Sequence, residues 1–462
     1  MIQSVFIGRR FIMQKNMTSG SEWKTILVFS LPIMGANLLQ VTYNFADSVI
    51  LGNFVGSAAL GAVGLVFSMV WLLTAVCTAL GNGVNIAVAQ FYGAGKKQEI
   101  HKTIRAAYLL CFLVALSLLL LAFLIADPLI VGFLRAPEHM QADSRTYFLI
   151  YGAGTIFLLL YNVTYGILRA HGDSRGAMVF LFVSALLNIL LDLICVVSLH
   201  MGVAGAAIAT VVSEAGAAIA SMIYMNRVLP GYLPKNLRPE EFGAYAGLLA
   251  KLSIPIALQT MVNSTCFLIL QRLINSFGTA SIEGYAAMLK IEQYAHIPSN
   301  SFNVAISSFT GQNIGAGLYD RARRGYRATI GMGVGICAVL CILVFLFDRE
   351  LLSIFGITGE SLKRACEHLD LLMLFIWMST ITNITNGFLQ GAGDVKTPTV
   401  TTFLNLAVRL SLSFILAGTA VGYRCYFVSM PPAWTLACLL VVLRYRSGRW
   451  KNYGIVSGSG SR

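Results

Sequence analysis

The feature that most limits what this chain can fold into is the apolar run AAYLLCFLVALSLLLLAFLIA, residues 106–126, which contains no charged side chain. An α-helix of about 20 consecutive apolar residues is long enough to cross the hydrocarbon core of a bilayer. A water-soluble domain would have to expose part of such a helix to water. The run therefore predicts a transmembrane helix.

Composition extends this prediction to the whole chain. Of 462 residues, 57% are hydrophobic and only 11% are charged, whereas about 25% of residues are charged in soluble domains. This excludes a cytosolic enzyme, a nucleic-acid module and a disordered scaffold. The net charge of +13 does not indicate nucleic-acid binding, because the basic residues form short clusters between apolar runs, as in cytoplasmic loops of membrane proteins.

Apolar runs recur along the chain, and they are continuous rather than alternating, which favours helices over a β-barrel. We predict an all-α polytopic membrane protein with twelve transmembrane helices, at about 26–51, 58–91, 106–126, 147–166, 177–198, 203–225, 246–275, 284–309, 328–347, 369–389, 399–418 and 422–443. The last of these predicted helices is the weakest, because its apolar run is short and contains Arg424 and Cys425.

The distribution of Lys and Arg sets the orientation. Most of the 33 cations lie in the N-terminal segment, the C-terminal tail and every second loop between the predicted helices. The positive-inside rule then places both termini in the cytoplasm of a multi-pass protein in a bacterial-type inner (plasma) membrane. No cleavable signal peptide is expected in residues 1–25, and the nine cysteines read as small buried side chains, not as a disulfide or zinc framework.

The chain repeats itself at long range. Residues 30–33 (SLPI) recur as 253–256 (SIPI), 89–95 (AQFYGAG) as 311–317 (GQNIGAG), and 166–173 (GILRAHGD) as 387–394 (GFLQGAGD). Six helices per repeat give both halves the same orientation, so we expect two six-helix bundles around a central cleft, which is the plan of alternating-access transporters. The expected parts are a cytoplasmic segment (1–25), an N-lobe (26–225), a linker (226–245), a C-lobe (246–443) and a basic tail (444–462).

Several charged side chains fall inside the predicted helices, where a charge costs at least about 2.5–3.5 kcal/mol. Asp47 follows Gln40 by seven residues, and Asp192 follows Asn188 by four, so each pair shares a helix face. Thr210 adds a hydroxyl from the next helix. Together these residues offer only oxygen ligands, which a hard cation prefers.

Two neighbouring carboxylates in a medium of low dielectric constant cannot both remain charged and empty, so either one binds a proton or both share a cation. The set therefore predicts a coupling site for Na⁺ or H⁺, with Na⁺ held by Asp47, Asn188, Asp192 and Thr210. The alternative is that each aspartate only bonds to neighbouring groups of the helix bundle.

Four more charges are candidates for the cleft: Glu214, Lys290, Glu292 and Arg409. Lys290 and Glu292 are two residues apart and should face different directions. Through the repeat, Asn188 corresponds to Arg409 and Asp192 to Ser413, so the first half is acidic where the second is basic or neutral. A structural ion pair among these charges is as good an interpretation as a substrate contact, and His296 reads as an interior histidine.

As a set, the motifs resemble the MATE family (multidrug and toxic compound extrusion) in its prokaryotic DinF-like branch. They are SLPI, NFADSVILG, VAQFYGAG, GILRAHGD, NILLD, SIPI, KIE, GQNIGAG, GFLQGAGD and RYRSGRWK. The resemblance implies two six-helix lobes and a cation site in the first lobe, formed by Gln40, Asp47, Asn188, Asp192 and Thr210, with Tyr147 as a tyrosine of the cleft. Another branch has coupling acids in helices 7 and 10, which this chain lacks apart from Asp370 at a helix edge.

The predicted function is a secondary antiporter that exports organic, cationic or amphiphilic compounds in exchange for Na⁺ or H⁺. Its expected partners are small organic substrates and membrane lipids. We expect a functional monomer that needs no cofactor apart from the coupling ion, and neither nucleic-acid binding nor enzymatic activity. The alternative is a flippase or exporter for a lipid-linked saccharide or a specific metabolite, which should have a more cationic cleft. A channel is less favoured, because no filter-like loop is present.

Overall fold

The computed structural model describes residues 16–55, 57–134, 136–230 and 238–456, without the side chains of residues 43–53, 57, 58, 60, 133 and 177. No strand occurs in these described ranges. The long helices are α2 (Glu22–Phe54), α3 (Ser57–Gly93), α4 (Lys97–Asp127), α5 (Glu138–Ala170), α6 (Arg175–Asp192), α7 (Gly202–Val228), α8 (Pro239–Asn275), α9 (Thr279–Gly315), α10 (Tyr319–Ser353), α11 (Gly359–Gly391), α12 (Lys396–Ala417) and α14 (Met430–Arg446).

Short helical segments complete the chain: η1 (Pro128–Phe133), η2 (Leu193–Ser198), η3 (Gly422–Arg424), α13 (Cys425–Val428) and η4 (Arg449–Tyr453). Within the described residues, 11 helices are long and apolar enough to cross a membrane. The 37-residue α9 is not among them, because many Ser, Asn and charged residues lower its hydropathy. The prediction of an all-α polytopic membrane protein is confirmed.

The helices form two compact units, and the chain divides between them inside two helices. Unit 1 holds Leu31–Ala257, while unit 2 combines Met17–Ser30 with the chain from Leu258 onward. The start of α2 is bound in unit 2 by Glu22, which contacts Arg324 at 2.8 Å. The start of α8 is bound in unit 1, where Glu241 contacts Lys102 at 3.0 Å. The observed units therefore differ from the predicted lobes 26–225 and 246–443 at these two helices.

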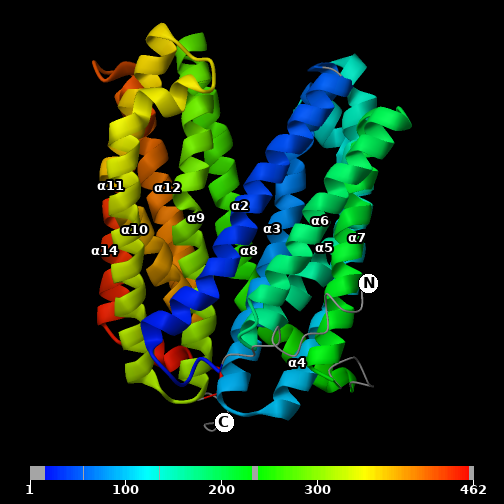
Figure 1. Ribbon diagram of the computed structural model, residues 1–462, viewed down its shortest axis with the longest axis vertical. Helices are drawn as coiled ribbons and strands as arrows, with labels where there is room; N and C mark the ends of the chain where they lie inside the picture. The colour runs from blue at the N-terminus through cyan, green and yellow to red at the C-terminus, as the bar shows by residue number, and fades with distance from the viewer. Residues whose placement is uncertain (1–15, 56, 135, 231–237, 457–462) are drawn as a thin grey trace. The chain divides into compact units, whose positions relative to one another are not determined.

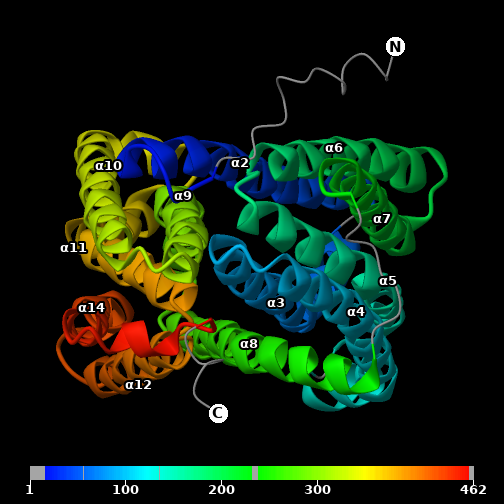
Figure 2. The ribbon, with the colours of Figure 1, turned by 90° about the horizontal axis from the view of Figure 1, so that it is seen from below.

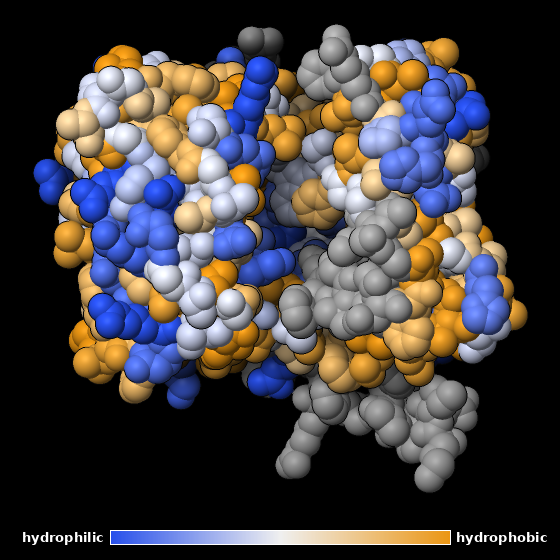
Figure 3. Space-filling view, turned by 90° about the horizontal axis from the view of Figure 1, so that it is seen from above, coloured by the Kyte–Doolittle hydropathy of each residue, from blue (hydrophilic) through white to orange (hydrophobic). Residues whose placement is uncertain are grey.

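Helix α4, which contains the run 106–126, shows why these units need a membrane. The side chains of Leu109, Phe112, Leu116, Leu120 and Leu124 are all exposed. Contiguous apolar surface of this kind is rare on soluble monomers and is stable in contact with lipid. Figure 3 shows both kinds of side chain end-on, with hydrophilic ones (blue) gathered in patches on the face turned to the viewer and hydrophobic ones (orange) between and around them.

The repeat is visible in how helices pack inside each unit. The most extensive contacts are between α3 and α5 in unit 1 and between α9 and α11 in unit 2, and both pairs can be followed in Figures 1 and 2. A Cβ atom added at Gly166 would lie 2.3 Å from the carbonyl oxygen of Gly81, and one added at Gly387 would lie 2.3 Å from that of Asn303. Glycine allows the same close backbone approach at both repeat positions.

The motifs GILRAHGD and GFLQGAGD also end their helices in the same way. Gly172 (φ 83°) and Gly393 (φ 92°) follow α5 and α11 in the left-handed conformation, where glycine carries no steric penalty. Each following aspartate accepts a hydrogen bond from the first turn of the next helix. Gly176 N–H donates to Asp173 at 2.9 Å, and the Thr397 hydroxyl donates to Asp394 at 2.9 Å. The repeat therefore specifies a helix–turn–helix unit twice.

Replacing Gly387 by Ala should destabilise the protein, because the new methyl group overlaps the Asn303 carbonyl oxygen. Overpacking of this kind costs about 1–3 kcal/mol, so thermal unfolding of the purified protein in detergent should occur at a lower temperature. Gly331→Ala is the matched control, since nothing lies within 4 Å of a Cβ at Gly331. Equal unfolding temperatures for the two variants would show that the α9–α11 contact is not constrained in this way.

Two helix ends differ from the sequence prediction. Helix α8 already begins at Pro239, inside the predicted linker 226–245. The predicted final helix, 422–443, is interrupted: η3 and α13 precede α14, with Ser429 between α13 and α14. Pro431 and Pro432 lack backbone N–H groups, so a continuous helix would lose hydrogen bonds at this point, and proline is favoured in the first turn of a new helix.

Candidate functional site

Three of the predicted ion-site residues lie on two neighbouring helices of unit 1, and two of them, Asn188 and Thr210, are in contact. Asn188 and Asp192, both on α6, are buried with exposed fractions of 3% and 0%. The Asn188 amide donates a hydrogen bond to the Thr210 hydroxyl of α7 at 3.4 Å, and that hydroxyl donates to the Ala206 carbonyl at 3.0 Å. The structure therefore confirms that Asn188 and Thr210 are neighbours.

The backbone changes form directly after Asp192. Helix α6 ends at this residue and continues as the π-helical turn η2, Leu193–Ser198. Wider turns of this kind occur frequently at functional sites. The corresponding residue in unit 2, Ser413, lies inside the uninterrupted helix α12, and its hydroxyl is 2.7 Å from that of Ser429. The two halves therefore differ at this position in chemistry and in backbone form.

The side chains of this set present oxygen atoms, the ligand type that hard cations prefer. The Oδ1 atom of Asn188 is buried and has no hydrogen-bond partner within the described part of the chain, so an amide oxygen is available beside a fully buried carboxylate and a hydroxyl. Carboxylate, amide and hydroxyl oxygens are ligands of Na⁺-like hard ions. A buried acceptor without a partner is unusual in a packed core, which fits a ligand-binding role.

Among the described side chains, the structure does not bring the other residues of the predicted ion site into contact with Asn188 and Thr210. Asp47 lies on α2, but its side chain falls outside the described residues. Gln40, two turns earlier on the same helix, is exposed. The ring of Tyr147 on α5 is buried and stacks on Tyr151 at a centroid distance of 6.4 Å. No contact that the structure describes joins Gln40 or Tyr147 to Asn188 and Thr210, so their roles stay predictions.

The four candidate cleft charges divide into two groups. Glu214 lies on α7, four residues after Thr210, and is half-buried. Lys290 is exposed, whereas Glu292 is buried, which confirms that these two face different directions. Arg409 on α12 is also buried, at 6% exposure. None of these four residues forms a salt bridge with another of them in the described ranges.

The motif GILRAHGD contains a buried cation, Arg169. Arg169 lies in the last turn of α5 with only 3% exposed. Its guanidinium donates to Asn82 Oδ1 at 3.0 Å and lies 4.2 Å from the centre of the Tyr165 ring. Nearby, burial lowers the pKa of His171 to about 4, so this histidine is neutral at physiological pH. A basic side chain next to a helix end gives no sequence signal for burial.

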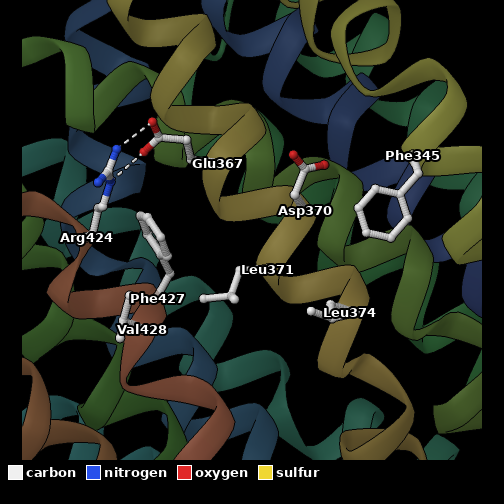
Figure 4. A pocket seen from close by; sticks show the side chains of 8 residues that line it. All are labelled: Phe345, Glu367, Asp370, Leu371, Leu374, Arg424, Phe427 and Val428. Atoms are coloured by element: carbon white, nitrogen blue, oxygen red, sulfur yellow. Dashed lines mark hydrogen bonds and ion pairs between the residues drawn. The ribbon is translucent and has the colours of Figure 1, made fainter.

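A pocket of about 390 Å³ lies in unit 2, among α10, α11 and α13. Figure 4 shows Glu367 and Arg424 pointing toward each other, with contacts of 2.8 and 2.9 Å, and Asp370 one turn farther along α11. The remaining lining is apolar: Phe345, Leu371, Leu374, Phe427 and Val428. The pocket contains none of the predicted ion-site residues, so it is chemically separate from the oxygen set.

Comparison with known proteins agrees with this arrangement. The model of the MatE family matches twice, at residues 32–194 and 255–415, which confirms the internal repeat. The chain is 27% identical over 440 residues to the probable multidrug resistance protein YpnP of Bacillus subtilis (strain 168), covering 94% of this chain and 97% of that protein. It is 25% identical to the probable multidrug resistance protein NorM of Thermotoga maritima, covering 94% of each chain.

Solved structures show the same fold at lower sequence identity. A MATE protein crystallised in complex with MaL6 has a TM-score of 0.86 and 22% identity, covering 95% of this chain and 99% of that one. An outward-facing multidrug resistance MATE transporter of the MOP superfamily has a TM-score of 0.85 and 22% identity, with 94% and 98% covered. Because the family model matches most of the chain in two successive copies, the chain belongs to the MatE family of membrane transporters.

Proposed function

We propose that this transporter is a secondary antiporter that exports organic, cationic or amphiphilic compounds while Na⁺ or H⁺ moves inward. The curated relatives that span almost the whole chain are named multidrug resistance proteins, which supports export of organic compounds. The single observation that supports ion coupling is the oxygen set of unit 1, where Asn188 Oδ1 lies buried and unbonded beside Thr210 on the same helix face as the buried Asp192.

In this proposal the ion acts by cancelling charge. A buried anionic Asp192 is costly in a medium of low dielectric constant, and a bound cation or proton removes that cost. Ion binding therefore favours one packing of α6 and α7 and ion release favours another, as alternating access requires. The distribution of Lys and Arg supports an orientation with both termini in the cytoplasm. A monomer in the plasma membrane is part of the proposal.

The experiment uses purified protein in proteoliposomes loaded with ethidium, an organic cation. An inward Na⁺ gradient, an inward H⁺ gradient and no gradient are imposed in parallel, and ethidium release is recorded by fluorescence. We expect at least one gradient to accelerate release several-fold over the gradient-free vesicles. Equal release under all three conditions, with a panel of other cationic dyes giving the same result, would reject coupled export.

A flippase for a lipid-linked saccharide would give a different result. Such a protein would move a fluorescent phospholipid analogue between leaflets and would leave ethidium inside the vesicles. The same liposomes can carry both probes, so the two functions are distinguished in one preparation. The acidic set in unit 1 favours the cation exporter, because phosphate groups would be repelled by buried carboxylates.

A further inference from the structure

The pocket of unit 2 opens on a surface that faces lipid. Of its lining side chains, Phe345 is 45% exposed and Leu374 is 56% exposed. Exposed apolar side chains continue this surface on both helices, with Leu346 next on α10 and Trp377 one turn farther along α11. Contiguous apolar surface of this kind is stable in contact with acyl chains. A ligand that enters this pocket therefore comes from the bilayer.

The acidic residues of the pocket lie at the depth of the lipid headgroups. Helix α11 has 33 residues, and at about 1.5 Å per residue it is longer than the hydrocarbon core of about 30 Å. Glu367 and Asp370 lie in its third and fourth turns, and the apolar run 371–377 (LLMLFIW) follows directly. The boundary between headgroups and acyl chains is therefore expected beside Asp370.

The charge of Asp370 is not balanced, whereas that of Glu367 is. The Glu367 carboxylate accepts hydrogen bonds from Nε and Nη2 of Arg424 at 2.8 and 2.9 Å. Asp370 is half-buried and makes no hydrogen bond or ion pair with any residue in the described ranges. Figure 4 shows its carboxylate apart from the Glu367–Arg424 pair. An unpaired charge at the edge of the hydrocarbon core is costly, so a cationic group of a ligand would stabilise it.

The lining of the pocket matches the parts of a phospholipid. An ammonium group has three N–H donors for a carboxylate such as that of Asp370. The Nη1 atom of Arg424 takes no part in the two bonds to Glu367, and guanidinium groups bind phosphate well. The remaining lining is apolar. We propose that this pocket binds a phospholipid with a primary amine, its ammonium on Asp370, its phosphate beside Arg424 and its acyl chains on the apolar lining.

The size and charge of the pocket select among lipid headgroups. Its volume of about 390 Å³ lies within the range of small-molecule sites. Two carboxylates and one guanidinium leave an excess of one negative charge, which repels anionic phosphatidylglycerol. Phosphatidylcholine carries a positive charge, but its trimethylated nitrogen has no N–H group to donate. Phosphatidylethanolamine meets both requirements. Lipid binding here is independent of the antiport function, because the pocket contains none of the ion-site residues.

The test compares three lipids with the same two oleoyl chains. Purified full-length protein in dodecyl maltoside is mixed with phosphatidylethanolamine, phosphatidylcholine or phosphatidylglycerol, and thermal unfolding and the number of bound lipids in native mass spectra are recorded. A ligand that binds only the folded state raises the unfolding temperature. We expect phosphatidylethanolamine to raise it by several degrees more than the other two lipids do, and to be retained in the mass spectra.

Asp370→Asn should fold normally, since Asp370 has no partner to lose in the described ranges, and it should abolish the preference for phosphatidylethanolamine. Val428→Trp should abolish it too, because Val428 lines the pocket and a larger side chain fills it while Asp370 stays in place. The matched control is Asp127→Asn, which removes a carboxylate that is paired with Arg145 at another helix end; this variant should keep the preference.

Equal stabilisation of the wild type by the three lipids would overturn the lipid site, as would an unchanged preference in Asp370→Asn. Binding of ethidium to the same variants, followed by its fluorescence, tests whether the pocket takes exported cations instead. Weaker ethidium binding by Asp370→Asn, together with an unchanged lipid preference, would assign the pocket to cargo and reject the lipid. Neither result would bear on ion-driven export, which is measured separately in proteoliposomes.

Discussion

Replacing Asp192 by Asn is expected to lower ion-driven ethidium export from proteoliposomes by about two orders of magnitude. The asparagine keeps the size of the side chain but removes the negative charge that the coupling ion would neutralise. Asp192 is fully buried at the end of α6, so no water can take over that charge. Gradient-free ethidium binding should persist, because the substitution leaves the packing of α6 against α7 unchanged.

The control for this variant is Asp127→Asn. Asp127 ends α4 and pairs with Arg145 at 3.1 Å, with more than half of each side chain exposed. An exposed pair contributes about 0–1 kcal/mol, so this variant should export ethidium as the wild type does. Both variants should unfold at the same temperature, so that any difference in export is not a difference in folding. Full gradient-driven export by Asp192→Asn would then reject the proposed role of Asp192.

Replacing Asp394 by Ala should have the largest effect on stability. Its fully buried carboxylate contacts Arg444 at 2.7 Å and accepts a hydrogen bond from the Thr397 hydroxyl. Removing one partner of a buried ion pair costs about 3–5 kcal/mol, because the other charge remains without compensation. We expect a marked drop in the thermal unfolding temperature and in the yield of monodisperse protein from size-exclusion chromatography.

Asp320→Ala provides the comparison. Asp320 pairs with Arg323 at 3.9 Å, but its side chain is 87% exposed, and such surface substitutions change stability by about 0.5 kcal/mol or less. If Asp394→Ala were as stable as Asp320→Ala, the Asp394–Arg444 pair would contribute little, and the repeated turn would have to be stabilised by its glycine and backbone hydrogen bonds alone.

Much of the fold could be predicted from the sequence, because lipid imposes a simple rule on each helix separately. A long apolar run such as 106–126 has only one stable form in a bilayer. The repeat was equally readable, since close backbone contacts at Gly166 and Gly387 require glycine at both positions. The interruption at Ser429 follows from Pro431 and Pro432, which are readable in the sequence. The division of α2 and α8 between units depends on tertiary contacts, which hydropathy does not report.

The candidate sites were predictable to different degrees. Asn188 and Thr210 lie on successive helices, so spacing along the chain was enough to bring them together. His368 lies buried on α11 against Tyr285, Tyr426 and Phe427, and no spacing rule relates it to these residues. The burial of Arg169 is not readable from the sequence either, since its partner Asn82 is on another helix, α3.

The glycine contacts have a consequence for how the protein is made. The contacts of Gly166 with Gly81 and of Gly387 with Asn303 each lie within one half of the chain. During synthesis, each α3–α5 or α9–α11 pair can therefore dock as soon as its second helix enters the bilayer, without waiting for the other half. Early docking shortens the time for which polar groups such as Glu292 are exposed to lipid, and so protects a slowly inserted chain from misassembly.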